Sequence, residues 1–468
     1  MSSLLDIIKR GKSRVFRRAY IKRRLRSTGQ FESDWVEITD EIKRWGTFTT
    51  DIDSERFNRF KFSSAKITVK NDEGLFNPED DENSLWFGYA ARARSLLQVR
   101  AGFIEETVTS GIWTQTKTPR DAPQFDIDLF DDGVIDDDAQ VVFTGIITGD
   151  IPSSSKNEVV LTAAPLNQVF RDFPAQRLNF FTTTGLSASQ FVQGLRDMTD
   201  GAGSFVFRPF FYNTTTGFNF TATSNIYQNL NTSGAKDIVD KDVWSTVEKL
   251  SEAEGFLAYC DRTGTFQFKT RTVGSTTEAY HFYGPGYFSS VYGTTIKQIS
   301  NFGPVNSKFY SRVQVKYREE DTSTSYHVVE SSLTVAGNNS IWNYGYRTYS
   351  LENTWIPTTT AAETIAQTIF TNVSSLKKEL EVTTSFIPQL DVLDIVRVSF
   401  DASGSAPAES QWDNNNWADT SGAAATSGDL VWDGTRGDSI KLNNKEFVIL
   451  GTSVNLDNFE CKFKLRET

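Results

Sequence analysis

The chain has very little of the side-chain chemistry on which most enzymes rely. Its 468 residues contain two cysteines, Cys260 and Cys461, and two histidines, His281 and His327. Cysteines this far apart in the sequence form no disulfide framework and no cysteine-rich metal site. Both histidines lie in aromatic, strand-like segments without companion motifs for zinc or catalysis. A satisfied or solvent-exposed histidine is therefore the expected role of each.

Long apolar runs and nucleotide or hydrolase motifs are also missing. No stretch approaches the ~18 uninterrupted apolar residues that a membrane-spanning helix needs. The N-terminus places a short apolar run before its positive charges, which is the reverse of a secretory signal, so synthesis in a cytoplasm is expected. There is no GxxxxGK[ST] loop and no G-x-S-x-G elbow. The sequence predicts no enzymatic activity, no cofactor and no catalytic or metal-binding residue.

Charge is unevenly distributed along the chain. The formal net charge is −11, yet the N-terminal 26 residues are strongly basic. The cations are Lys9, Arg10, Lys12, Arg14, Arg17, Arg18, Lys22, Arg23, Arg24 and Arg26. Such an arm can contact nucleic acid, a membrane or an acidic protein, or can be a solvated helix face running into an edge strand. We expect residues 1–17 to leave the body of the protein and to dock on an acidic protein neighbour.

Hydrophobic periodicity predicts a mainly β protein. Segments such as AKITVKN, LLQVRAGF, VVFTGIIT and EVVLTAAP are short, rich in β-branched or aromatic residues, and separated by Gly, Asn, Asp and Pro turns. Helical spacing appears in four places. The helices are expected over residues 3–16, after Ser187, around Val243, Val247 and Leu250, and around Ile365, Ile369, Val373 and Leu376.

The chain contains an internal echo. Residues 99–103, VRAGF, resemble residues 396–400, VRVSF, and each segment precedes a polar insertion and then a strand pair in which Gly145 matches Gly451. Self-similarity of an ordered set of elements indicates duplication. We therefore expect residues 18–170 to share strand order and connectivity with the core formed by roughly 276–318 and 376–468.

Each of the two polar insertions contains residues that could form a binding site. The first contains Asp126, Asp128, Asp131, Asp132, Asp136, Asp137 and Asp138. A calcium loop is disfavoured because its glycine is misplaced and no Glu closes it, so a solvated acidic loop is expected. The second contains Trp412, Trp417 and Trp432, which could stack on sugar rings. A carbohydrate-binding tail adhesin and a cell-wall hydrolase remain the alternative functions.

Four segments carry a family resemblance. They are FKFSSAKITVKNDEGLFNP (60–78), VVFTGIITGDIPSSSKNEVVLTAAPLNQVF (141–170), VEKLSEAEGFLAYCDRTGTFQFKTRT (247–272) and NNKEFVILGTSVNLDNFECKFKLRE (443–467). In this order they resemble the hub proteins of bacteriophage tail tips and baseplates. The resemblance implies two related tube-like β-barrel domains with an intervening α+β domain.

The resemblance also implies a domain plan. The parts are a basic N-terminal arm (1–17), a first tube-like β domain (18–170, insertion about 104–140), an α+β domain (171–275), a second tube-like β domain (276–318 and 376–468, insertion about 401–440) and an inserted α+β region (319–375). The implied role is a structural hub that joins a six-fold tail tube to a three-fold tip and forms part of the DNA-ejection conduit. A homotrimer carrying two such domains per chain would present six similar domains to the tube.

The resemblance also implies neighbours and a location. The partners would be the tail tube or distal tail protein, the tape measure protein and the central spike or fibre proteins, with DNA passing through the lumen without specific binding. The protein would lie in the tail tip of the virion after assembly in the host cytoplasm.

Overall fold

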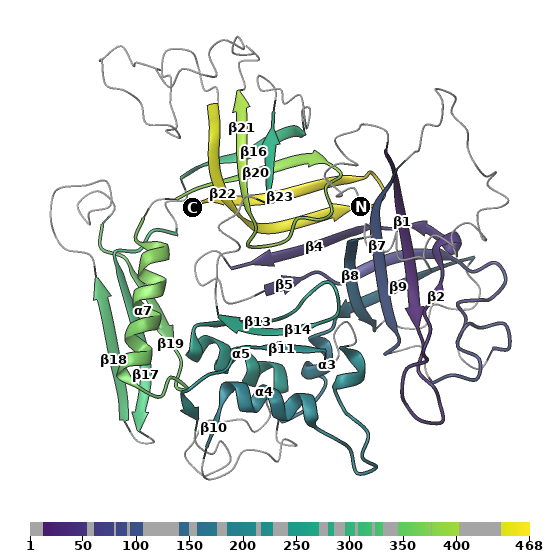
Figure 1. The fold of residues 1–468 in the computed structure, drawn as a ribbon, viewed down its shortest axis with the longest axis horizontal. Coiled ribbons are helices and arrows are strands. Elements are labelled where there is room, and N and C mark those ends of the chain that lie inside the picture. The colour runs from purple at the N-terminus through teal and green to yellow at the C-terminus, as the bar shows by residue number, and fades with distance from the viewer. Residues whose placement is uncertain are drawn as a thin grey trace.

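The structure is a computed structural model, and it is mainly β with few helices (Figure 1). It describes residues 13–53, 60–78, 81–90, 94–105, 140–148, 157–175, 185–211, 217–227, 242–270, 279–284, 295–304, 308–320, 323–330, 345–375, 377–401 and 441–468. Within these residues, no helix combines the length and the apolar character needed to cross a membrane.

The first sheet is built from the N-terminal third of the chain. Its strands are, in spatial order, β2 (Val36–Glu37), β1 (Ser13–Lys22), β7 (Leu96–Glu105), β8 (Gln140–Ile147), β9 (Glu158–Pro165), β6 (Ala65–Lys70) and β3 (Ile42–Arg44). Burial alternates along β6, where Ala65, Ile67 and Val69 are buried and Lys66 and Lys70 are exposed. This alternation is the pattern of a strand with one face on the core.

The second sheet is built mainly from the C-terminal third. Its main path is β15 (Tyr280–Tyr283), β21 (Ile395–Asp401), β22 (Lys441–Asn455), β23 (Glu460–Glu467), β20 (Lys378–Ser385) and β16 (Ile296–Pro304). Two more strands, β4 (Thr47–Ile52) and β5 (Phe60–Phe62), extend it from β22. The N-terminal part of the chain thus supplies strands to a sheet made mostly by the C-terminal part, which the predicted boundaries did not anticipate.

Six strands follow the same order in the two sheets. The path β1-β7-β8-β9-β6-β3 in the first corresponds, strand by strand in chain order, to β15-β21-β22-β23-β20-β16 in the second. In each sheet, the four successive strand pairs from β7 to β3 and from β21 to β16 are all antiparallel. The first strands of the two paths differ, because β1 runs antiparallel to β7 whereas β15 runs parallel to β21. The similarity seen in the sequence therefore corresponds to a common strand order, with one of these two strands reversed.

In sequence, an α+β unit lies between the strands of the first sheet and those of the main path of the second. Its elements are α3 (Gln168–Arg171), β10 (Leu186–Ser187), α4 (Ala188–Asp197), η3 (Arg208–Phe210), β11 (Phe218–Phe220), β12 (Ile226–Tyr227), α5 (Val243–Glu254), β13 (Phe256–Cys260) and β14 (Phe266–Thr270). Ser187 caps α4 in a capping box with Gln190, as expected. Helix α5 starts after Asp242 and ends at Gly255 in the left-handed conformation, which confirms that helix.

A second α+β unit is inserted between β16 and β20. Strands β17 (Arg312–Glu320), β18 (Ser323–Glu330) and β19 (Thr348–Glu352) form a sheet of order β18-β17-β19, and helix α7 (Thr359–Val373) packs on it. The buried residues Ile365, Ile369 and Val373 confirm this helix, while Leu376 lies outside the described residues. Since β17 pairs only with β18 and β19, the inserted unit begins by residue 312, earlier than the predicted boundary at 319.

The N-terminal prediction was partly wrong. Residues 13–16 belong to strand β1, which pairs along its whole length with β7 from Ser13 to Lys22, and not to a helix. Ala19 and Ile21 are completely buried on one face of this strand. The partner strand decides the conformation here, because tertiary pairing overrides the weak helical periodicity. Residues 13–17 are thus part of the body, and residues 1–12 lie outside the described part.

The two large sheets and the two α+β units are the four parts of the structure, and they surround a common centre (Figure 1). The inner faces of the two large sheets contribute to one continuous apolar core, and the two α+β units share another that reaches the first sheet through Leu96, Ile146 and Ala164. A third core is much smaller and lies between the second sheet and β13. Contacts between all four parts mean that they pack as one body.

Candidate functional site

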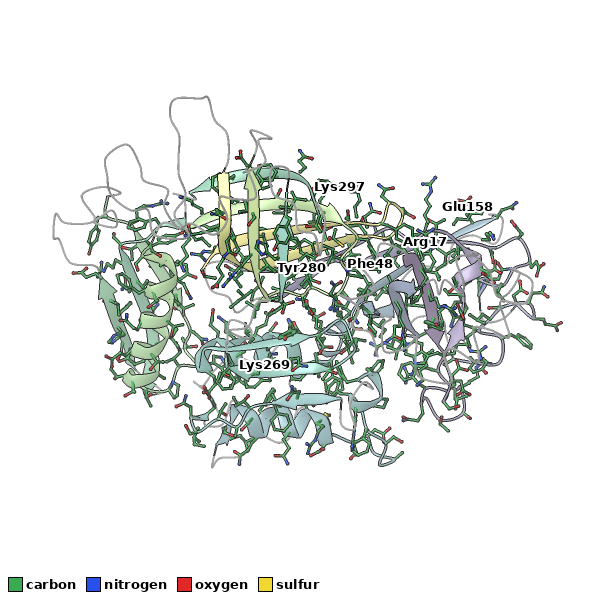
Figure 2. The ribbon with its side chains drawn as sticks, turned by 45° about the horizontal axis from the view of Figure 1, so that its top comes forward. Arg17, Phe48, Glu158, Lys269, Tyr280 and Lys297 are labelled. Carbon is green, nitrogen blue, oxygen red and sulfur yellow. The ribbon has the colours of Figure 1, made fainter. Side chains whose placement is uncertain are left out.

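The place where the two large sheets meet is the best-defined site in the described part of the chain. Arg17, from β1 of the first sheet, lies between two aromatic rings, with its guanidinium carbon 5.0 Å from the centre of Trp45 and 4.9 Å from that of Phe459. The guanidinium also donates to the carbonyl of Leu456 in the β22–β23 turn. Figure 2 shows Arg17 and Phe48 in this region. A cation held by two rings and a carbonyl fixes the angle at which the sheets meet.

The same turn is fixed from the other side by Asp457. Its carboxylate accepts hydrogen bonds from the amides of Trp45, at 2.9 Å, and Gly46, at 3.0 Å. These amides belong to the segment that leads into β4, which then pairs with β22 from Asp51 opposite Gly451 to Thr47 opposite Asn455. We call Arg17, Trp45, Asp457, Phe459 and the β4–β22 pairing the sheet junction.

The two glycines matched in the sequence both lie where the backbone is crowded. A Cβ on Gly451 would lie 2.2 Å from a carboxylate oxygen of Asp51 on the neighbouring β4. On Gly145 it would lie 2.3 Å from the carbonyl oxygen of Ala164 on β9. The contact at Gly145 is with a backbone atom, so this position requires glycine, whereas the contact at Gly451 is with the end of a side chain that can move. The two matched glycines therefore do not mark the same close approach in β8 and β22.

Beside the junction, the outer face of the second sheet is polar and carries charges of both signs. Asp51 lies near Lys464, Lys61 and Glu381. Burial raises the pKa of the Asp51 carboxyl, and the two lysines oppose this rise while Glu381 adds to it. Further along this face, Lys308 pairs with Glu379 at 2.7 Å. Mixed charge of this kind suits a wetted surface better than a site for a single anion.

The cations of the basic segment have partners within the chain. Arg23 forms an ion pair with Glu32 at 2.7 Å and lies 3.8 Å from the ring of Tyr89. Arg18 pairs with Glu37, and Lys22 lies over Trp35. Arg24 donates two hydrogen bonds to the carbonyl of Gly29. The predicted free arm ended at residue 17, so Arg18 to Arg24 were expected in the body, where carboxylates, aromatic rings and a backbone carbonyl lie beside them. Of the predicted arm, residues 13–17 are instead part of strand β1.

His281 has a hydrogen-bond partner, as the sequence predicted. His281 Nε2 lies 2.9 Å from Ser399 Oγ, and the ring stacks on Tyr283 at 4.0 Å between centroids. Burial, assisted by Arg397, lowers the pKa of His281 to about 4. His327 lies in β18 opposite Val315. Cys260 and Cys461 are both buried and free. Among the described residues, no group of three or more metal-binding side chains comes together.

Several candidate residues lie outside the described part. They are the seven aspartates of the first insertion and Trp412, Trp417 and Trp432 of the second. Sequence reasoning missed the sheet junction altogether. Its only local signal is an Arg, a Trp-Gly pair and an Asp-Asn-Phe turn, and nothing in the sequence indicates that segments more than 400 residues apart meet.

The fold and this site together give two sheets of matching strand order that are joined by the sheet junction. No protein-family model matches the chain, and no curated protein matches it. Solved structures do resemble it over nearly its full length.

Three of these structures are tail proteins. One from Neisseria meningitidis MC58 is 10% identical, covers 96% of this chain and 96% of its own, and has a TM-score of 0.47. A prophage MuSo2 43 kDa tail protein from Shewanella oneidensis is 12% identical, with 96% and 98% covered and a TM-score of 0.43. The prophage tail protein gp18 from Listeria monocytogenes EGD-e is 10% identical, with 96% and 94% covered and a TM-score of 0.45.

Proposed function

We propose that this chain is a structural hub of a phage tail tip or baseplate, which joins a six-fold tail tube to a three-fold tip. The observation that carries the proposal is the common order of six strands in the two sheets, held together by the sheet junction. A chain with two sheets of the same strand order can supply two similar domains to a symmetric assembly.

The proposal includes duplication and a homotrimer. Three chains with two related domains each supply six similar blocks, which matches a six-fold neighbour above and leaves three-fold symmetry below. Edge strands support this arrangement. In the described part, each of the two matched paths ends in an edge strand without a further partner, β3 in the first sheet and β16 in the second. A closed ring would cover such edges, which otherwise invite aggregation.

In the proposed assembly the hub also forms part of the DNA-ejection conduit. Its partners would be the tail tube or distal tail protein, the tape measure protein and the central spike or fibre proteins. The mixed charge around Asp51, Lys464 and Glu381 supports a surface along which a phosphate backbone passes without specific binding.

Imaging of the assembled particle tests this proposal directly. We expect three copies of the chain in one ring at the tail tip, with both large sheets facing the six-fold tube. A matched particle lacking this protein should lack that ring and its attachment to the tube. Six copies in a single ring, or a peripheral position on a fibre, would contradict the hub and favour the adhesin.

A further inference from the structure

The contact between the first α+β unit and the second sheet is small and is separate from the two large cores. Its buried apolar residues are Ile52, Leu257, Val392, Leu393, Val448 and Leu450. On its flank, Phe60 of β5 stacks on Tyr259 of β13 at 4.0 Å between ring centroids. Because opening free energies rise with the apolar area that is buried, a small isolated core is a natural place for local opening.

One arginine clamps the two parts across this contact. Arg262 lies in the tight β13–β14 turn, and its guanidinium donates to the carbonyls of Pro388, at 2.7 Å, and Gln389, at 2.9 Å. It also forms an ion pair with Asp391 at 3.4 Å. The turn itself is rigid, because Asp261 accepts hydrogen bonds from the amides of Thr263 and Thr265. A rigid turn therefore holds the loop between β20 and β21 through one side chain.

The clamped loop contains two features that disfavour its own conformation. Leu393 has a φ of 76°, a left-handed conformation that leucine seldom adopts. Gln389 buries both polar atoms of its side-chain amide without a hydrogen-bond partner in the protein. A buried amide without partners is unfavourable, so the loop stays closed only while its surroundings hold it.

We propose that residues 388–394 and the Arg262 turn form a latch, which opens as one unit while the two large cores remain closed. Opening would hydrate the Gln389 amide and let the backbone of Leu393 leave its left-handed conformation, and both changes favour the open loop. Breaking the clamp and the small core opposes them. The latch is thus a two-state element that links the first α+β unit to the second sheet. The inference does not depend on the proposed hub function.

Hydrogen–deuterium exchange of the full-length protein tests the latch through the amides of Asp391, Val392 and Leu393. These amides donate to Asp394 Oδ2, Asp391 Oδ1 and the Ile449 carbonyl, respectively. Arg262→Gln should accelerate their exchange about tenfold or more, because the charged clamp is lost. Exchange in β17 and β8, which belong to the large cores, should not change.

A second variant should act in the opposite direction. Gln389→Met keeps the length of the side chain and removes the unpartnered amide, so exchange in residues 388–394 should slow. Arg196→Gln removes the surface pair with Asp197 and a contact with the ring of Phe220, neither of which involves the latch, so this matched control should leave the loop unchanged. Equal acceleration throughout the protein in Arg262→Gln, or unchanged or faster loop exchange in Gln389→Met, would overturn the latch.

Discussion

At the scale of single residues, side chains that link distant segments matter most. Arg17 is the clearest case, because its partners Trp45, Leu456 and Phe459 come from both ends of the chain. Each of these contacts is modest alone. Together they hold a charge in an aromatic setting where water would otherwise compete for it.

Replacing Arg17 should therefore destabilise the whole protein. Arg17→Gln removes the cation from both rings and should lower the free energy of unfolding by ~1 to 3 kcal/mol. Urea denaturation followed by tryptophan fluorescence measures this change. Arg94→Gln is the matched control, because Arg94 pairs with Asp172 at the surface, and it should lose ~0 to 1 kcal/mol. Equal losses in both variants would show that the junction has no special role.

His281 should make stability depend on mild acid. Its pKa is lowered to about 4 in the folded protein, whereas an unfolded histidine titrates near ~6.5. The unfolded chain therefore binds the proton first, so stability is fully present above pH ~6.5 and falls as the pH drops towards 4. His281→Gln can keep the contact with Ser399 and should flatten this dependence between pH 7 and 4.5, measured as the urea midpoint. His327→Gln, the control, should retain it.

At the scale of elements, local signals were sufficient for the helices and insufficient for the strands that cross between sheets. Helices α4 and α5 were predictable because Ser187, Asp242 and Gly255 specify their ends within a few residues. Residues 13–16 of strand β1 were predicted as helix because their partners in β7 lie about 90 residues away. The placement of β4 in the second sheet depends on a partner still further along the chain, which no periodicity encodes.

The crowded glycine in β8 gives a test at this scale. Gly145→Ala would place a methyl group 2.3 Å from the Ala164 carbonyl, so β8 and β9 must separate locally. We expect a loss of ~2 to 4 kcal/mol in the free energy of unfolding, measured by chemical denaturation. Gly303→Ala, also in a strand but with open space around its Cβ, should change stability by less than ~1 kcal/mol. If the two variants behave alike, the close approach does not require glycine.

At the scale of the whole molecule, the chain is organised as a scaffold. Its main features hold parts of the chain relative to one another. They are the two matched sheets, the small third core and the paired cations of the basic segment. The sequence indicated the shared strand order because residues 99–103 and 396–400, in matching strands, have similar sequences. It did not indicate the sheet junction, because contacts of that kind depend on the packing of the complete chain.

We expect the purified protein to have no hydrolase activity on peptidoglycan or polysaccharide. The chain has two histidines and lacks a nucleophile motif, and the perturbed His281 is bound to Ser399 within a sheet. Zymography with host cell walls is the measurement, with a muralytic enzyme in a parallel lane as positive control. A cleared zone in the gel that disappears when one carboxylate is substituted would instead show that the protein is a hydrolase.

The strand shared between the sheets has a consequence for the order in which the protein is made. Thr47–Ile52 leaves the ribosome about 400 residues before Gly451–Asn455, with which it pairs. At ~5 to 20 residues per second, this strand waits roughly 20 to 80 s for its partner. A chain released early, at any point before residue 451, cannot complete the second sheet. Only a chain that extends through β22 and β23 can therefore form both sheets.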